Sequence, residues 1–226
     1  MRKLSVISHN TKGLHTFDLT RKDSNCKKYC SIAAICYINN NLQDKLNKKY
    51  INKMKRNFKL LNSDKFVKVV SNEIFQRNLA RFRFFSNGDI IHANFKKSDI
   101  QINNIFKCCY KNKNIKFWLT TRNFNAFYRY ITQKNNLVPE NLNIMLSLEI
   151  DEVNDFIIKW AKENKISVSQ IVLTKKESNC LSSQNGKSCT SNLCSKCFDY
   201  GNRYFYIHGK NNKQKLRELI KIESRR

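Results

Sequence analysis

Acidic residues are scarce in this sequence. Its 226 residues include 17 Asp and Glu against 43 Lys and Arg, for a formal net charge of +26 at pH 7, densest in Lys45–Lys59 and Lys210–Arg226. Such an excess creates a positive surface potential, and nucleic acids are the commonest intracellular partners of a field of that sign. AT-rich genomes also favour Lys, Asn and Ile, but that drift does not explain the shortage of acids. We therefore expect RNA or single-stranded DNA as the partner.

Long apolar runs are also missing. No stretch reaches the roughly 18 consecutive apolar residues of a membrane-spanning helix, and the first residues lack the apolar core of a secretory signal. These absences predict a cytoplasmic protein without membrane contact. Because the cytoplasm keeps thiols reduced, the nine cysteines indicate metal ligation rather than disulfides.

Common catalytic motifs are absent as well. The chain has no Gly-rich phosphate loop, no Ser–His–Asp pattern and no His-Glu-x-x-His motif, which argues against a nucleoside-triphosphate enzyme or a hydrolase. A disordered polymer is excluded too, because 41% of the residues are hydrophobic and 12% are aromatic. The length suits a single domain, residues 1–226, with one substantial core.

Strand-like and helix-like periodicities alternate along the chain. The β-rich runs are Lys3–Ser8, Arg81–Ser86, Ile115–Thr120, Asn143–Leu148, Val168–Thr174 and Arg203–His208. From Arg81 onward a strand recurs about every 25 to 35 residues, which predicts successive βα units around a parallel sheet. The expected fold class is α/β, with either an open parallel sheet or a partial (βα) barrel. The pattern does not distinguish these two.

Particular residues indicate the helices between the strands. Val153–Ala161 keeps apolar residues at helical spacing, so that one side of the helix faces a core. Asp64 is placed to cap a helix whose apolar side begins at Phe66. Ile105–Tyr110 indicates another helix, and Leu216–Ile220 a last, very basic one.

Two long segments, residues 9–48 and 175–202, interrupt this alternation and contain seven of the nine cysteines. The first segment holds a Cys-x3-Cys-x5-Cys run, made by Cys26, Cys30 and Cys36. Three converging thiolates can hold a four-iron (4Fe-4S) cluster with one iron left open for an external ligand. With His9 or His15 they would instead complete a zinc site. Buried thiols packed on a helix are the third interpretation.

The second segment holds four cysteines, Cys180, Cys189, Cys194 and Cys197. The Cys-x2-Cys pair at its end lets two sulfurs face one metal, and four thiolates complete a closed tetrahedral shell. A second iron–sulfur cluster and zinc both satisfy this ligand set. Cys108 and Cys109 are adjacent within a helical pattern, and we interpret them as core residues.

The order of several short motifs resembles one known family. The motifs are Cys36-Tyr37, Arg83-Phe84-Phe85-Ser86-Asn87-Gly88-Asp89, Phe117-Trp118-Leu119-Thr120-Thr121-Arg122, Val138-Pro139-Glu140-Asn141-Leu142, Ser147-Leu148 and Tyr206-Ile207-His208-Gly209. In this order they are similar to the "gene product 88-like" proteins of bacteriophages and related mobile elements, over nearly the whole chain. The resemblance implies a protein of the host cytoplasm, with a host protein as a further candidate partner.

The layout also resembles the radical S-adenosylmethionine enzymes, whose partial barrel binds a four-iron cluster through three cysteines after the first strand. Those enzymes usually have Cys-x3-Cys-x2-Cys, whereas the second gap here has five residues. The resemblance implies S-adenosylmethionine as a ligand near Gly88 and Asp89, which match the turn that receives its amino group. Arg122 follows one strand and Ser147 lies near the end of another, and both would line the same pocket.

Two functions follow from these expectations. The first is an iron–sulfur protein, similar to radical S-adenosylmethionine enzymes, that modifies or binds nucleic acid. The second is a non-catalytic nucleic-acid-binding or host-directed phage protein in which zinc holds the two cysteine segments. Whether the chain is an enzyme stays open at this point.

Overall fold

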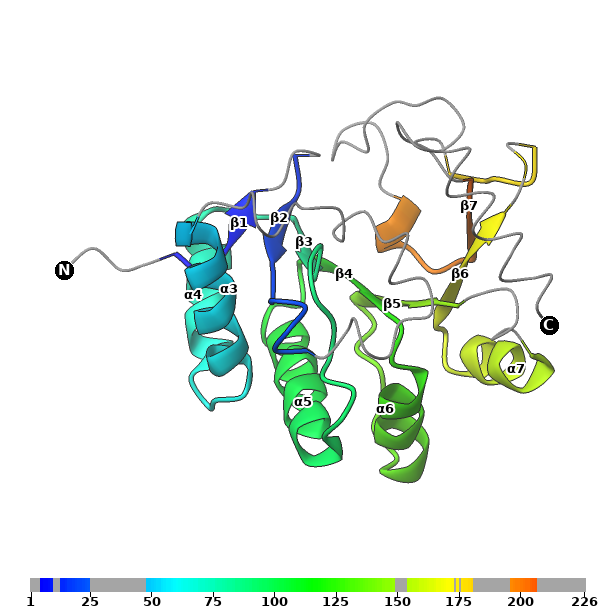
Figure 1. The fold of residues 1–226 in the computed structure, drawn as a ribbon, viewed down its shortest axis with the longest axis horizontal. Coiled ribbons are helices and arrows are strands. Elements are labelled where there is room, and N and C mark those ends of the chain that lie inside the picture. Colours follow the sequence, from blue (N-terminus) through cyan, green and yellow to red (C-terminus); the bar gives the residue numbers. More distant parts are fainter. Residues whose placement is uncertain are drawn as a thin grey trace.

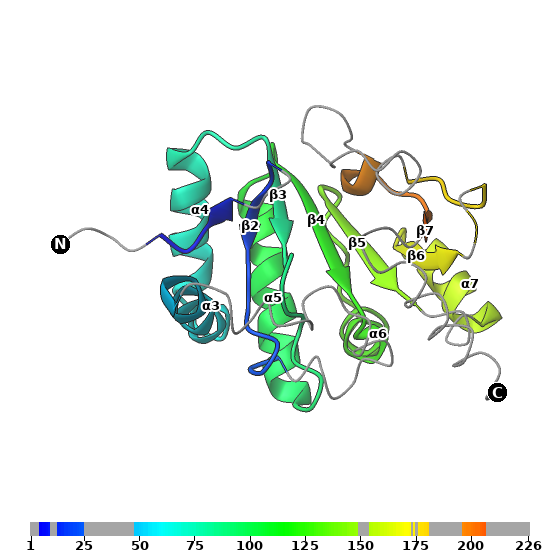
Figure 2. The same ribbon diagram turned by 45° about the horizontal axis from the view of Figure 1, so that its top comes forward.

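The computed structural model describes residues 5–9, 13–24, 48–148, 154–172, 174, 176–180 and 196–206. Its strands form one seven-stranded sheet whose order in space is the order in the chain (Figures 1 and 2). The strands are β1 (Ser8–His9), β2 (His15–Phe17), β3 (Arg81–Phe84), β4 (Lys116–Thr121), β5 (Leu142–Ser147), β6 (Ser167–Val172) and β7 (Arg203–Tyr206). β1 pairs with β2 antiparallel, and each later pair is parallel. The predicted α/β fold with a largely parallel sheet is confirmed.

The helices lie along one side of this sheet (Figure 1). They are α3 (Lys48–Leu61), α4 (Phe66–Gln76), α5 (Phe95–Lys111), α6 (Phe124–Tyr128) with a following π-helical turn (Arg129–Gln133), and α7 (Asp155–Glu163). A short 3₁₀ turn, η2 (Lys196–Phe198), lies on the other side. Right-handed crossovers between parallel strands in sequential order return over the same face, which places the helices between β2 and β6 together.

The alternation of each strand divides the buried residues into two groups. Phe82, Phe84, Phe117 and Leu119 face the helices and belong to the main core, in which the Phe84 and Phe117 rings stack with centroids 5.5 Å apart. The opposite face carries a smaller apolar cluster, Leu14, Trp118, Met145, Cys197 and Phe198. Parallel sheets are usually covered on both faces and have apolar strands throughout. The polar residues in β3, β4 and β5 are therefore unusual.

Several local predictions were wrong. Within the described residues, Lys3–Ser8 contributes only Ser8 to a strand, and β2 lies inside a segment predicted as loop. α4 begins after Lys65, with no side chain capping it, so Asp64 is not its N-cap. The α7 prediction is confirmed at Ile157, Trp160 and Ala161, which are buried.

Cys108 and Cys109 are core residues, as predicted. Both are fully buried in α5 and pack in the main core. Burial raises the pKa of Cys108 to about 12 and raises that of Cys109 as well. Both therefore stay protonated thiols at neutral pH, as is usual for buried structural cysteines. Among the described helices, none is long and apolar enough to cross a bilayer.

The aromatic core should carry much of the stability. Replacing Phe117, which is fully buried, with Ala should lower the free energy of unfolding by about 3–5 kcal/mol, because it removes a large side chain and leaves a cavity. Phe75, which is 85% exposed on α4, is the matched control, and Phe75→Ala should change stability by less than about 0.5 kcal/mol. Urea denaturation followed by circular dichroism measures both. Equal losses would contradict the assignment of the core.

Candidate functional site

Parallel α/β sheets bind ligands at the carboxyl ends of their strands. Here the ends of β2, β3 and β4 run into three polar segments, Asp18, Ser86–Asp89 and Thr121–Asn123. These segments lie at one edge because their strands are neighbours in register, with Phe17 beside Phe84 and Phe84 beside Leu119. This edge is the candidate site.

Asp18 is the most heavily hydrogen-bonded side chain of the edge. It is fully buried directly after β2. Its Oδ1 accepts from Ser86 N (2.7 Å), Ser86 Oγ (2.9 Å) and Asn87 N (3.1 Å). Its Oδ2 accepts from Thr16 Oγ1 (2.6 Å) and Tyr50 OH (2.8 Å). A buried carboxylate needs such donors, and these ones join β2, the turn after β3 and helix α3.

Gly88 fits this turn because it carries no side chain. Its φ is +79°, and a Cβ atom there would lie 2.8 Å from both the Cβ and the carbonyl oxygen of Leu19. Leu19 N also donates to the carbonyl of Asn87 (3.0 Å). The turn after β3 is therefore pressed against the chain leaving β2, in a conformation that glycine adopts most easily.

Asp89 joins the same turn to the end of β4. Its Oδ1 accepts from Ile90 N (2.7 Å) and Thr121 Oγ1 (2.6 Å), and its Oδ2 accepts from Arg122 N (2.8 Å). His92 Nε2 lies 3.5 Å from Oδ2. The carboxylate is buried and surrounded by these groups, so in this geometry it positions the strand ends.

The four residues predicted to line a ligand pocket occupy adjacent strand ends. Gly88 and Asp89 follow β3, Arg122 follows β4, and Ser147 ends β5, one residue beyond the Thr121–Leu146 pair. Arg122 and Ser147 are half-buried. The predicted ligand contacts of all four stay predictions. The sequence did not indicate Asp18, Tyr50 or Thr121, whose partners are distant in the chain.

The first cysteine group lies outside the described residues, which stop at Ser24 and resume at Lys48. Both flanks of that gap lie at the candidate site. Ser24 O accepts from His92 N (3.4 Å), beside Asp89, and Tyr50 OH donates to Asp18. The chain that carries Cys26, Cys30 and Cys36 therefore leaves from and returns to the carboxyl edge.

His9 and His15, the alternative zinc ligands, lie elsewhere. They face each other across β1 and β2, with ring centroids 4.9 Å apart. His15 opens β2, whereas the chain reaches Ser24 only after β2 has ended. Burial, with the nearby His9 and Arg77, lowers the pKa of His15, so its ring stays neutral at pH 7. A neutral ring suits a metal ligand, but this pair lies at the amino end of the strand.

The second cysteine group is described only at its two ends. Cys189 and Cys194 lie outside the described residues, while Cys180 and Cys197 are buried. Cys197 O accepts from Asn143 Nδ2 (2.9 Å), on the sheet face opposite the helices. Within the described ranges no three His, Cys, Asp or Glu side chains converge on a point where a metal could sit.

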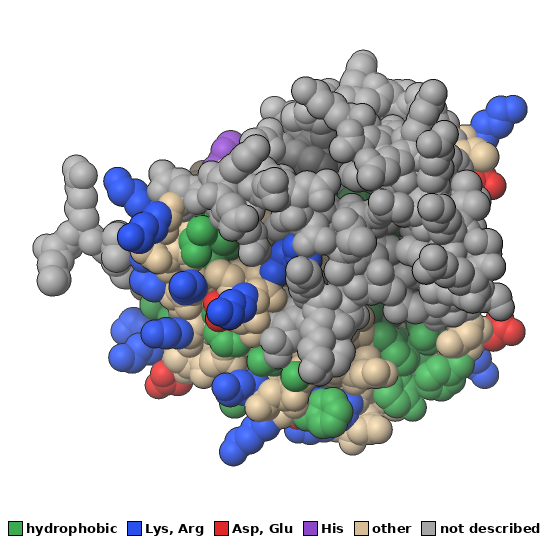
Figure 3. Space-filling model, viewed as in Figure 1, with side chains coloured by type: hydrophobic (Ala, Val, Ile, Leu, Met, Phe, Trp, Pro, Cys, Tyr) green, Lys and Arg blue, Asp and Glu red, His purple; other side chains and the backbone are tan. Residues whose placement is uncertain are grey.

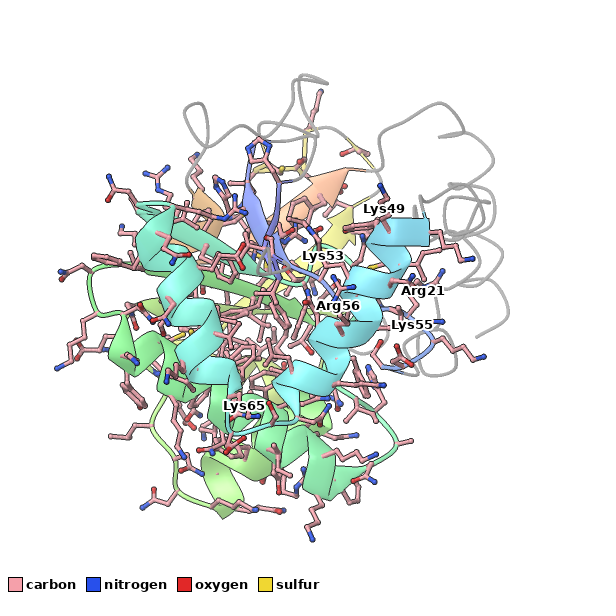
Figure 4. All side chains as sticks on the ribbon, turned by 90° about the vertical axis from the view of Figure 1, so that its left-hand side faces the viewer. Arg21, Lys49, Lys53, Lys55, Arg56 and Lys65 are labelled. Atoms are coloured by element: carbon pink, nitrogen blue, oxygen red, sulfur yellow. The ribbon has the colours of Figure 1, made fainter. Side chains whose placement is uncertain are left out.

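A basic surface lies beside this edge. The outward side of α3, hereafter the α3 face, carries Lys48, Lys49, Lys53, Lys55, Arg56 and Lys59, and the helix contains no acidic residue. Figure 4 shows Lys49, Lys53, Lys55 and Arg56 along this helix, and Figure 3 shows Lys and Arg crowded near α3 and α4. The inward side is fixed by buried Met54, Asn57 and Leu61.

Comparison with protein families gives a match over most of the chain. A protein-family model described as Gene product 88 matches residues 6–220. No curated protein matches the chain, and no solved structure matches it either.

The Gly88 turn can be tested by adding one methyl group. Gly88→Ala should lower the free energy of unfolding by about 2–4 kcal/mol, because the new Cβ meets the Leu19 backbone at a positive φ. Thermal or urea unfolding measures the change. A loss under about 0.5 kcal/mol would show that the turn tolerates a side chain.

Proposed function

The chain belongs to the Gene product 88 family, and we propose that it binds RNA or single-stranded DNA through the α3 face. The observation that carries this proposal is the segregation of charge on α3. The helix presents six cations and no acid over 14 residues. A positive face of this kind attracts the phosphate backbone and releases the counterions condensed on it.

The two described acids that act on Lys53 of the α3 face, Glu73 and Asp18, are both engaged by other groups. Asp18 lies below the helix, fully buried among its hydrogen-bond donors. Glu73 on α4 is engaged by Arg77 (3.0 Å) and by the backbone N of Val6 (2.8 Å). The positive potential of the face is therefore directed at solvent, where a polyanion can approach it.

The α3 face is also held in place. Asn57 donates to the carbonyls of Val6 (2.9 Å) and Asp18 (3.1 Å), so α3 is tied to the chain on both sides of the β1–β2 hairpin. Lys53 Nζ donates to Ile7 O (3.2 Å), and burial lowers the pKa of Lys53. Lys48, Lys49, Lys55, Arg56 and Lys59 are exposed and can meet phosphates.

Three of these cations supply the test. Replacing Lys55, Arg56 and Lys59 together with Gln keeps helix propensity nearly unchanged. Affinity for a single-stranded oligonucleotide should fall at least about tenfold near 150 mM salt, and the slope of log K against log salt should fall by about 2, since roughly 0.7 counterion is released per phosphate contact. Fluorescence anisotropy at several salt concentrations measures both quantities.

The control has the same loss of charge at another place. Lys107, Lys111 and Lys113 are exposed at the end of α5 and just beyond it. Their joint replacement with Gln should change affinity by less than about threefold, because it lowers net charge without touching the α3 face. If both triple variants lose affinity equally, binding is a property of net charge and the proposed site is rejected.

A second function is favoured by the flanks of the first cysteine segment, which meet at the carboxyl edge. We propose that Cys26, Cys30 and Cys36 hold an iron–sulfur cluster next to this edge, with Gly88, Arg122 and Ser147 nearest to a ligand such as S-adenosylmethionine. Three thiols are a suitable donor set for a cluster with one open iron, which supplies a coordination site and an electron. The second group would hold a closed cluster or zinc.

Metal analysis after purification without oxygen tests this function. A brown protein with several irons per chain supports two clusters or one cluster with zinc, whereas a colourless protein with zinc alone supports the non-catalytic alternative. Cys26→Ser should remove metal while sparing the fold, and Cys194→Ser should destabilise it, because a closed structural site contributes folding energy. Cys109→Ala is the control and should leave the metal content unchanged. Less than one metal per chain in the parent protein would rule out both sites.

A further inference from the structure

The sheet face opposite the helices, here the polar face, carries side chains unusual for a buried surface. On the adjacent strands β3 and β4, Arg83 and Trp118 are paired in register, and Thr120 follows on the same side of β4. The Arg83 guanidinium lies over the Trp118 indole, 4.1 Å from the ring centroid. Trp118 is 8% exposed and packs in the small apolar cluster with Met145 and Phe198. This cation–π contact holds the Arg83 guanidinium against a buried indole.

Three polar atoms of this group have no hydrogen-bond partner. Within the described part of the chain, Arg83 Nε, Trp118 Nε1 and Thr120 Oγ1 are all buried and unbonded. The other tryptophan of the chain behaves differently, since Trp160 Nε1 donates to Thr132 Oγ1 at 2.7 Å. Buried polar groups are nearly always bonded, so three unbonded ones on two neighbouring strands call for a missing partner.

The chemistry of the three atoms identifies that partner. Arg83 Nε and Trp118 Nε1 can only donate, and the Thr120 hydroxyl can also donate, so the partner must be an acceptor. Asp18, at the end of neighbouring β2, is already occupied by its own donors. We propose that Arg83, Trp118 and Thr120 form a binding site for an oxyanion, the phosphate or carboxylate group of a small molecule.

This site is separate from the α3 face, because α3 packs with the main core on the helix side of the sheet. The inference therefore does not depend on the proposed nucleic-acid function. The α3 face offers mobile, hydrated cations, whereas the polar face offers one stacked guanidinium and two fixed donors. An oxyanion bound there exchanges water for directed hydrogen bonds, which favours a small ligand over a polymer backbone.

Inorganic phosphate and acetate, each added at constant ionic strength, are the probes. In a Trp160→Phe background Trp118 is the remaining tryptophan, so its emission reports on the site directly. One of the two anions should shift this emission saturably and raise the melting temperature in parallel; the anion that acts identifies the ligand group as phosphate or carboxylate. Arg83→Gln should weaken this anion at least tenfold and Thr120→Val about three- to tenfold.

Two controls separate this site from the rest of the basic surface. Arg81→Gln removes the same charge from the same strand and face, where the guanidinium lies 5.9 Å from the Phe198 ring, and should change the anion affinity less than twofold. The Lys55, Arg56 and Lys59 triple variant should also retain anion binding. Equal weakening in Arg81→Gln and Arg83→Gln overturns the proposal, because the anion would then bind by charge alone. Absence of a response to both anions overturns it too, leaving water as the partner of the three donors.

Discussion

The helices that connect β2 to β6 all lie over one face of the sheet (Figure 1), as right-handed crossovers between parallel strands in sequential order require. This arrangement determines whether the residue at each strand position is apolar or polar. Residues facing the helices must be apolar, as in the aromatic row Phe82, Phe84 and Phe117. Residues facing the other way meet no α-helix in the described part of the chain, so Arg83, Thr120 and Asn143 can occupy them. In β3, with the sequence Arg-Phe-Arg-Phe, the two phenylalanines face the helices and the two arginines face the other way.

The carboxyl edge depends on the same arrangement for its rigidity. Three consecutive strands end side by side, and two buried carboxylates join their ends: Asp18 joins β2 to the turn after β3, and Asp89 joins that turn to β4. Each of these hydrogen bonds contributes little to the free energy of folding. A buried carboxylate left without its donors, however, destabilises the fold by much more than one such bond contributes. The two carboxylates therefore hold the three strand ends together as one unit.

The sequence predicted the elements whose residue pattern lies within the element itself. It missed elements that are too short for a pattern or that depend on distant partners. β3 to β7 were predicted because each is a short run of residues that favour strands, and α7 because its apolar stripe is regular. β2 has three residues, too few for a period, and its neighbour β3 lies more than 60 residues away. α3 was noticed only as a run of charge, since its lysines obscure the buried stripe Met54, Asn57 and Leu61. The cap predicted at Asp64 failed because the turn at Ser63, rather than a side-chain cap, leads into α4.

In the candidate site, too, the sequence indicated some residues and not others. Gly88 and Asp89 are visible as turn residues after a strand, and their place at the carboxyl edge follows from the parallel sheet. Asp18 and Tyr50 carry no local sign of their role, because the partners that define it are 32 and 68 residues distant from Asp18. The three donors on the polar face were equally hidden, since an absent hydrogen bond is a property of packing and never of sequence.

The two kinds of positively charged surface in this molecule differ in how strongly salt screens them. The cations of the α3 face are mostly exposed, so salt screens them over a Debye length of about 8 Å at physiological ionic strength. Arg83 stacks on a buried indole, where screening is weak and direction matters more than net charge. Ligands that meet the first kind lose affinity steeply as salt rises, and ligands that meet the second kind lose little. The salt dependence of any ligand of this protein therefore indicates which of the two surfaces holds it.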